Sequence, residues 1–238
     1  MRRDEVTLDG IMKSRMWLVV LGMCGCCWTL GAETGHPDVD GPEWRPLFVE
    51  DLSDADFPAG VWWWENGELT ANEDQMISTR RDYENFDLDL EFKTADGTNS
   101  GVIIYISDPK EWIPNSVEIQ IADDHSDRWG QADPTWQCGA LFGRLAASES
   151  RVNLPGEWNR MTVVARGQHL RVILNGAEII DADLSQWTSA TTNPDGSEIP
   201  KWLSRPMADL ATSGRIGLQG KHAGAPVWFR NLRVREIK

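Results

Sequence analysis

Hydrophobic and polar residues alternate in short segments along the chain from Trp44 onward. The clearest example is FDLDLEFK at 86–93, in which Phe or Leu alternates with an acidic residue or Lys. Successive side chains on a β-strand point to opposite faces, so this pattern predicts a strand with one apolar face. The chain holds further segments of this kind, and together they predict strands at 45–49, 61–65, 68–71, 75–78, 86–93, 101–107, 116–122, 139–142, 159–166, 169–174, 177–183, 215–219 and 227–236.

The connections between these segments predict an antiparallel arrangement. Asn66-Gly67 and Asn175-Gly176 each separate two predicted strands, and both residues of this dipeptide accept the positive φ that a two-residue hairpin requires. Many short strands at this spacing predict an all-β fold, a sandwich of two antiparallel sheets in one domain over residues 44–238. The segment 184–213 breaks the pattern and predicts a long loop with a short helix at most, a kind of excursion that often forms a binding lid.

The segment 99–124 is the one around which we expect the site to be organised. Val117, Ile119 and Ile121 share one face of its second predicted strand, and Glu118 and Gln120 share the other. A strand with an apolar face and a face carrying a carboxylate beside a carboxamide suits a sheet that covers a core and presents a groove on its open side. The alternative is an ordinary half-exposed strand without a ligand.

Composition narrows the classes of partner. The 238 residues carry a formal net charge of −14, with 41% hydrophobic and 25% charged residues. Nucleic acids and anionic membranes require a basic surface, so neither is an expected partner, whereas neutral sugars and cations are compatible with this charge. The chain has 13 Trp and only 2 Tyr. Trp rings stack on sugar rings but also fill cores, and the sequence leaves both roles open.

The first 32 residues predict an export signal. Lys13 and Arg15 precede an apolar run from Met16 to Leu30, which is followed by the small residues Gly31 and Ala32. This run is too short and wrongly flanked for a membrane-spanning helix. Met12 resembles a more natural start of the signal than Met1. We therefore expect a periplasmic or secreted protein, followed after the signal by a polar linker at 33–43 in which His36 is solvated.

The cysteines allow one alternative to signal cleavage. Three of the four lie in the leader, and Cys26 follows Gly25, so lipid attachment at Cys26 would make the protein a lipoprotein. Removal of the leader leaves Cys138, for which burial as a small apolar residue is the expected role.

Nine segments of the chain match one family pattern in order. They are GPEWRPLFVEDLSD, WWWENGELT, DYENFDLDLEFK, NSGVIIY, VEIQIADD, GALFG, GEWNRMTVVARGQHLRVILNG, GRIGLQGKHAG and VWFRNLRVREIK. Over about residues 43–238, the chain resembles the 3-keto-disaccharide hydrolase domain family, also described as 3-keto-glucoside 1,2-lyases and 3-keto-2-hydroxyglucal hydratases. The resemblance implies a concanavalin A-like jelly-roll sandwich, in agreement with the strand pattern.

The resemblance also implies a chemistry. A ketone at C3 of a sugar acidifies the hydrogen on C2, so a base can remove that hydrogen and the enolate can expel the group on C1. Water can then add to the unsaturated product. Such a site needs a base near C2, a donor or cation for the enolate oxygen, and a proton donor for the leaving oxygen.

The roles that follow for individual residues are expectations of the resemblance. Glu118, Asp123 and His222 are the predicted catalytic residues, with Glu118 as general base or cation ligand. Relatives commonly have an Asp-His pair after LQ, and Gly220 and Lys221 intervene here, so the partner of His222 is open. Tyr105 stands where relatives often carry Arg. The predicted substrate-binding residues are Asn99, Gln120, Glu91, Tyr105, Gln219, Arg230 and Trp129.

A divalent cation is an open possibility of the same residues. Glu118, Asp123 and His222 could hold Ca²⁺ or Mn²⁺ through oxygen and imidazole ligands, although no spacing in the sequence requires it. The chain has no dinucleotide-binding glycine pattern. A separate sugar 3-dehydrogenase is therefore expected to make the 3-keto substrate.

Two other functions compete with elimination. Glu118 and Asp123 resemble in spacing the carboxylates of laminarinase-type glycoside hydrolases, but an odd separation along a strand puts them on one face only if the strand bulges or ends. The second alternative is a non-catalytic sugar-binding module, whose platform would come from Trp62, Trp63, Trp64, Trp112, Trp129 and Trp136.

Overall fold

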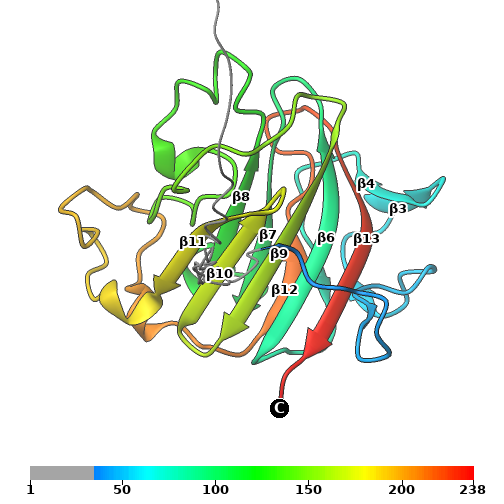
Figure 1. The fold of residues 1–238 in the computed structure, drawn as a ribbon, viewed down its shortest axis with the longest axis horizontal. Coiled ribbons are helices and arrows are strands. Elements are labelled where there is room, and N and C mark those ends of the chain that lie inside the picture. The colour runs from blue at the N-terminus through cyan, green and yellow to red at the C-terminus, as the bar shows by residue number, and fades with distance from the viewer. Residues whose placement is uncertain (1–34) are drawn as a thin grey trace, which may run out of the picture. The chain divides into compact units, whose positions relative to one another are not determined.

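The computed structural model describes residues 35–238, which form a sandwich of two antiparallel sheets (Figure 1). The predicted export signal at 1–32, with Met12 and Cys26, lies outside the described residues. The strands are β1 Arg45–Pro46, β2 Ala55–Asp56, β3 Trp62–Glu65, β4 Glu68–Ala71, β5 Ile77–Thr79, β6 Phe86–Thr94, β7 Asn99–Ile106, β8 Val117–Ala122, β9 Trp158–Arg166, β10 His169–Leu174, β11 Ala177–Asp183, β12 Arg215–Leu218 and β13 Val227–Glu236.

The larger sheet has eight strands in the order β11-β10-β9-β6-β13-β4-β3, with β1 also paired to β13. The smaller sheet has the order β2-β5-β12-β7-β8. Within residues 35–238, four single turns of 3₁₀ helix accompany the strands: η1 Ile113–Asn115, η2 Pro134–Trp136, η3 Leu184–Gln186 and η4 Met207–Asp209. The predicted fold class, an all-β jelly-roll sandwich of two antiparallel sheets, is confirmed.

The core lies between the sheets and follows the period-two pattern of the sequence. Leu88 and Leu90 on β6, and Ile119 and Ile121 on β8, are fully buried. Each such side chain stabilises the fold by roughly 1.5–3 kcal/mol relative to exposure. Because these apolar faces meet, the polar faces of β6 and β8 lie on opposite outer surfaces of the sandwich.

The hairpins form where the dipeptides predict them. Asn66 and Gly67 have φ of 53° and 79°, and Asn175 and Gly176 have φ of 48° and 85°. The predicted strand at 139–142 is only partly formed. Gly139 and Phe142 donate backbone hydrogen bonds to the carbonyls of Gln120 and Glu118 on β8, but Gly139 and Gly143 adopt positive φ and so limit the extended run to isolated bridges at Leu141.

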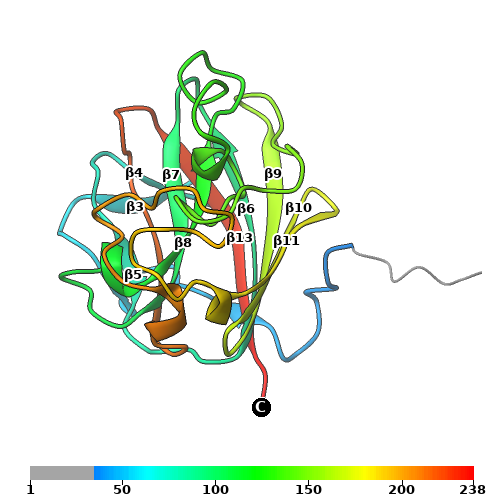
Figure 2. The same ribbon diagram turned by 90° about the vertical axis from the view of Figure 1, so that its left-hand side faces the viewer.

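The segment 184–213 contains only η3 and η4, as predicted, and it crosses the face of the smaller sheet over β8 (Figure 2). Arg144, which is buried, anchors it by donating from Nη2 to the carbonyls of Leu203 at 2.9 Å and Arg205 at 2.7 Å. Asn193 adds a hydrogen bond from Nδ2 to the carbonyl of Gly143 at 3.2 Å. These contacts place a long loop against β8 in a defined position.

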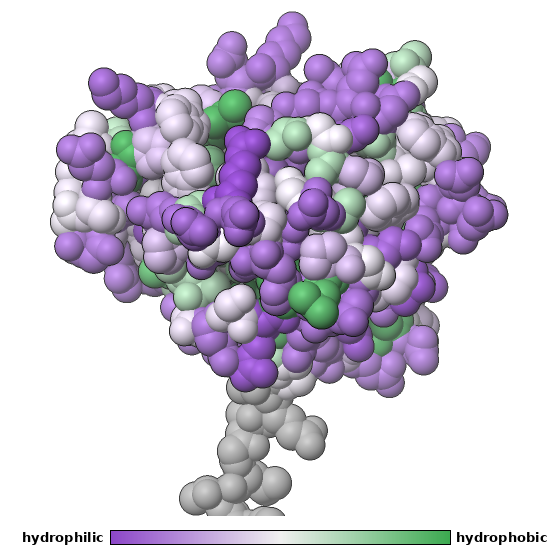
Figure 3. Space-filling view, turned by 90° about the horizontal axis from the view of Figure 1, so that it is seen from above, coloured by the Kyte–Doolittle hydropathy of each residue, from purple (hydrophilic) through white to green (hydrophobic). Residues whose placement is uncertain are grey.

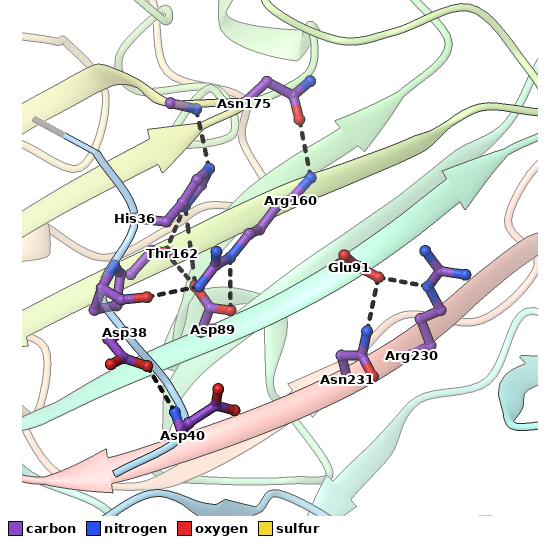
Figure 4. A network of polar contacts seen from close by, with 12 residues as sticks. His36, Asp38, Asp40, Asp89, Glu91, Arg160, Thr162, Asn175, Arg230 and Asn231 are labelled. Atoms are coloured by element: carbon purple, nitrogen blue, oxygen red, sulfur yellow. Dashed lines mark hydrogen bonds and ion pairs between the residues drawn. The ribbon is translucent and has the colours of Figure 1, made fainter.

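The described part of the predicted linker at 33–43 is in contact with the larger sheet, which corrects the expectation that His36 is solvated. The His36 ring accepts from the backbone N–H of Gly176 at Nε2, 3.0 Å away, and Nδ1 lies 2.8 Å from the Thr162 hydroxyl (Figure 4). Burial, and the nearby Arg160 guanidinium to a smaller extent, lower the pKa of His36 to about 4. The imidazole is therefore neutral at pH 7 and serves as a hydrogen-bonding anchor.

The surface seen from above in Figure 1 is mainly hydrophilic, with hydrophobic residues scattered singly (Figure 3). Over residues 35–238, the structure contains no helix with the length and apolar character that a membrane crossing demands.

Candidate functional site

An open cleft with a volume of about 360 Å³ lies on the outer face of the smaller sheet. Its floor is polar and comes from β7, β8 and the chain after β12, whereas its walls are largely apolar and come from loops. The residues that line it are Asn99, Trp112, Ile113, Glu118, Gln120, Arg128, Trp129, Trp136, Phe142, Trp202, Gln219 and His222.

Glu118 is the carboxylate of the cleft floor. It lies on β8 between the core residues Val117 and Ile119, so its side chain points away from the core. Desolvation, with a smaller contribution from the negative charge of Asp74, raises its pKa to about 8. A carboxyl group with this pKa is mostly protonated at pH 7 and ionises just above it, which suits it to proton transfer.

Gly101 on β7 makes room for this carboxyl group. A Cβ atom at Gly101 would lie 2.4 Å from Oε1 of Glu118. Non-bonded carbon and oxygen atoms do not approach so closely, so the Glu118 side chain would have to move. The glycine of the NSG segment therefore lets the Glu118 side chain lie across the neighbouring strand.

Amide side chains lie beside Glu118. Gln120 donates from Nε2 to Oδ1 of Asn99 at 3.0 Å, and both side chains are buried. Gln219 follows β12 and is fixed by its backbone, since its N–H donates to the carbonyl of Gly101 and its carbonyl accepts from the Ser100 hydroxyl at 2.7 Å. The floor thus carries oriented amides that can bind sugar hydroxyl or carbonyl oxygens.

His222 enters the cleft with a carboxylate partner. Its Nδ1 lies 2.6 Å from Oδ2 of Asp74. The two meet because the backbone at Gly220 packs directly on the 73–75 segment: Lys221 donates to the carbonyl of Glu73 at 2.9 Å, and a Cβ at Gly220 would lie 2.3 Å from that carbonyl oxygen. With Nδ1 held by Asp74, Nε2 is the nitrogen left to act in the cleft.

Aromatic rings form the walls. Trp136 contacts Phe142 and Trp202, with ring centroids 5.4 Å and 6.1 Å apart. Trp129 is buried, its Nε1 donates to the carbonyl of Gly97 at 3.0 Å, and the Arg128 guanidinium lies over its ring at 4.4 Å. Such walls suit the apolar face of a sugar ring or another flat group.

Of the ten predicted site residues, the cleft brings together six: Glu118, Gln120, Asn99, Gln219, His222 and Trp129. Glu91 and Arg230 do not lie there, which corrects the prediction that Glu91 faces the groove. They face each other on β6 and β13 of the larger sheet, joined by a hydrogen bond from Arg230 Nε to Glu91 at 2.5 Å, and Asn231 donates to the same carboxylate (Figure 4). Arg230 also lies over Trp158 at 3.9 Å.

Asp123 and Tyr105 also lie outside the cleft lining. Asp123 is buried and its two oxygens accept the backbone N–H groups of Gly97 at 2.9 Å and His125 at 3.1 Å, so it stabilises a turn. Tyr105 has a φ of 57°, which turns its ring into the core against Phe86, and its hydroxyl donates to the carbonyl of Gly167 at 2.9 Å. Burial raises the pKa of Tyr105 to about 12.

The structure does not bring Glu118, Asp123 and His222 together as ligands of a divalent cation. Asp123 is engaged by backbone donors and does not line the cleft that holds Glu118 and His222. The described part of the chain contains no cluster of three or more His, Cys, Asp or Glu side chains placed to hold a metal ion.

Five residues in or next to the cleft were not predicted from the sequence: Asp74, Ile113, Arg128, Phe142 and Trp202. Asp74 lies in a polar turn, where nothing local distinguishes it from its acidic neighbour Glu73. Trp202 had a usable signal, because it lies in the segment 184–213 that the sequence marks as a binding lid.

Comparisons with known proteins agree with this architecture. A solved structure of a candidate glycosyl hydrolase from Parabacteroides distasonis ATCC 8503 is 53% identical, superposes with a TM-score of 0.80, and matches 82% of this chain and 99% of its own. A second candidate glycosyl hydrolase from that organism, at 22% identity and a TM-score of 0.67 over 82% and 94% of the chains, shares the fold.

A curated relative is the 3-keto-disaccharide hydrolase of Bacteroides thetaiotaomicron, 26% identical over 181 residues. The match covers 65% of this chain and 59% of the relative, so the chain spans a little over half the length of that protein. A family model for the 3-keto-alpha-glucoside-1,2-lyase-like domain matches residues 40–235. The chain, with its polar cleft floor on the smaller sheet, therefore belongs to the 3-keto-alpha-glucoside-1,2-lyase-like family of carbohydrate-active proteins.

Proposed function

We propose that the protein cleaves 3-keto-glycosides by removing the C2 proton and eliminating the group on C1. The observation that carries the proposal is the pairing, in one cleft, of a single carboxyl group with a histidine that has its own carboxylate partner. Among the described residues that line the cleft, Glu118 is the one Asp or Glu. Family membership and the curated relative's name support the substrate class.

Glu118 is the proposed base. A base whose pKa is raised toward 8 is stronger than an ordinary carboxylate and is better matched to a carbon-bound proton that the adjacent ketone acidifies. Removal of the C2 proton places the electron pair in an enolate over C2, C3 and the ketone oxygen. The amides of the cleft floor are available as donors to that oxygen.

His222 is the proposed acid for the leaving group. As the enolate collapses, a C1–C2 double bond forms, the C1–O bond breaks, and the leaving oxygen takes a proton from Nε2 of His222. Asp74 stabilises the protonated ring and fixes its orientation. Addition of water to the unsaturated ketone would complete net hydrolysis.

Conventional hydrolysis fits this cleft less well. It requires two carboxyl groups about 5–9.5 Å apart on either side of the glycosidic bond. Asp123, the second carboxylate considered from the sequence, is occupied by backbone donors. A non-catalytic sugar-binding role is the second candidate, favoured by the aromatic walls, and is distinguished by the absence of turnover.

The setting of this activity is part of the proposal. The substrate carries a ketone that an oxidation must produce, so a separate sugar 3-dehydrogenase acts before this protein. The predicted export signal supports a reaction outside the cytoplasm.

The test uses a methyl 3-keto-glucoside labelled with deuterium at C2, with product formation followed by the absorbance of the unsaturated ketone and by NMR. The parent protein should release methanol with loss of the label and a primary isotope effect. Glu118→Gln should lower kcat by about 10²–10⁴-fold, while Glu91→Gln, on the opposite face of the sandwich, keeps the parent rate. Cleavage with the label retained, or full activity in Glu118→Gln, would contradict the proposal.

A further inference from the structure

Trp202 is a shared wall between the cleft and a second hollow next to it. This hollow has a volume of about 300 Å³, and Trp112, Ile113 and Trp202 line both it and the cleft. The cleft therefore continues past Trp202 into the second hollow, and both indole rings belong to the lining of each. A reacting sugar on the polar floor would direct the group attached to its C1 toward one of the cleft's openings.

Trp202 is exposed but held in place. The residue is 50% exposed, although its ring contacts Trp136. The next residue, Leu203, is fixed through its carbonyl by buried Arg144. Leu203 and Pro200 also pack on Gly143, where a Cβ would lie 2.8 Å from Leu203 Cδ1. An exposed indole in a fixed position is a preorganised binding surface, because little freedom remains to be lost when a ligand binds.

Both hollows carry polar groups, but the two sets differ in kind: the cleft has hydrogen-bonded amides, and the second hollow has exposed charged side chains and a serine. The cleft floor carries the amides of Asn99, Gln120 and Gln219. The hollow beyond Trp202 has, among its described lining residues, no Asn or Gln; its polar residues are Lys110, Glu111 and Ser204, all exposed. A second sugar ring needs several fixed hydrogen-bond partners, whereas a flat apolar group needs only ring faces.

We propose that the hollow lined by Trp112 and Trp202 binds an aromatic leaving group, so that the protein acts on aryl 3-keto-glucosides. This inference rests on the proposed function for its chemistry, and it adds the class of the group attached to C1. A phenol has a pKa of about 10, well below that of an alkyl alcohol, so its oxygen also leaves more readily in the elimination. The binding surface and the leaving-group chemistry therefore favour the same substrates.

The experiment compares phenyl and methyl 3-keto-glucosides, in both anomers, on the parent protein and on Trp202→Ala. The variant should raise KM for the phenyl substrate by about tenfold, the size expected for one aromatic contact, and change KM for the methyl substrate by less than twofold. Trp63→Ala is the matched control, since Trp63 is a 38% exposed tryptophan on β3 that does not line the cleft.

Three results would overturn the inference. An equal loss on both substrates would show that Trp202 contacts the reacting sugar itself. An unchanged KM for both substrates would show that the Trp202 ring takes no part in substrate binding. A 3-keto-disaccharide whose KM rises more than that of the phenyl substrate in Trp202→Ala would show that the hollow takes a second sugar.

Failure of the proposed function gives a different result. If the parent protein converts neither substrate, calorimetric binding of unoxidised phenyl and methyl glucosides still tests the hollow. Tighter binding of the phenyl glucoside that Trp202→Ala abolishes supports the aromatic site without the chemistry, and equal binding of both glucosides by the parent overturns it.

Discussion

Gly101 and Glu118 lie on neighbouring strands, and the carboxyl group of Glu118 occupies the space that a side chain at position 101 would fill. A Cβ at Gly101 would lie 2.4 Å from Oε1 and 2.9 Å from Cγ of Glu118. The position of the proposed base is thus determined by a residue that contributes no side chain of its own.

Gly101→Ala should displace the Glu118 carboxyl group. We expect kcat/KM on a 3-keto-glucoside to fall by about 10–100-fold, because a displacement of about 1 Å is costly at a reacting atom, and the free energy of unfolding to fall by about 1–3 kcal/mol from overpacking. Steady-state kinetics and urea unfolding measure the two effects. Gly35→Ala is the control, since a Cβ there meets nothing within 4 Å. Parent-like activity in Gly101→Ala would show that catalysis does not depend on the position of the Glu118 carboxyl group.

The activity should depend on pH in the direction expected when Glu118 acts as a base. Glu118 must be ionised to accept a proton, and its pKa is about 8, so the rate should fall toward acid pH. On the methyl 3-keto-glucoside the leaving oxygen also needs the proton of His222, so kcat/KM should pass through a maximum. On the phenyl 3-keto-glucoside, whose leaving group depends less on an acid, kcat/KM should instead rise with pH and level off above about 8. Profiles from pH 5 to 10 on both substrates measure this, and a phenyl rate that falls as pH increases through 8 would assign Glu118 the role of acid.

Ionisation of Glu118, which should raise activity, should lower the stability of the fold. Because burial raises the pKa of Glu118 in the folded state above its ordinary value of 4.5, the folded protein binds more protons, and stability is lost as pH rises from about 4.5 to about 8. Glu118→Gln removes this loss. Its gain in unfolding free energy should grow over that range to on the order of 2 kcal/mol, after allowance for the partial exposure of Glu118. Urea unfolding at several pH values measures it, and a gain independent of pH would contradict the shift.

The sequence was informative about which residues share a face of a strand and uninformative about which surface that face becomes. Glu91 on β6 and Glu118 on β8 both alternate with core residues, and the alternation is equally clear for each. In a sandwich whose sheets meet at their apolar sides, these two polar faces lie on opposite outer surfaces. The placement of Glu91 with Arg230 therefore depends on sheet assignment, which periodicity does not contain.

The remaining differences arise from contacts between distant segments. Tyr105 leaves the regular alternation because a single residue with positive φ turns its ring into the core, and Asp123 is engaged by backbone groups beyond the end of β8. The Asp74–His222 pair joins residues 148 positions apart. The position of His222 in the family motif marked the histidine, but only the packing at Gly220 identifies its carboxylate.

Asp74→Asn should weaken catalysis through His222 rather than through substrate binding. Loss of the carboxylate removes the stabilisation of the protonated ring, so we expect kcat to fall by about 10–100-fold with KM nearly unchanged, and the fall to be greater on methyl than on phenyl 3-keto-glucosides, because the better leaving group depends less on an acid. Glu73→Gln, an exposed acidic neighbour, is the matched control. Equal losses on both substrates would show that His222 does not protonate the leaving oxygen.

Arg144→Met should loosen the segment that carries Trp202. Burial of Arg144 lowers its pKa to about 10, yet its guanidinium holds the carbonyls of Leu203 and Arg205. Without these bonds we expect the free energy of unfolding to fall by about 2–3 kcal/mol. We also expect faster proteolysis within residues 188–206, and a several-fold higher KM for the phenyl substrate at an almost unchanged kcat. Arg151→Met removes an exposed pair with Glu149 and should change none of these. Because the position of Trp202 depends on Arg144, a variant with the same loss of stability but an unaltered KM would show that the aromatic wall keeps its place without this anchor.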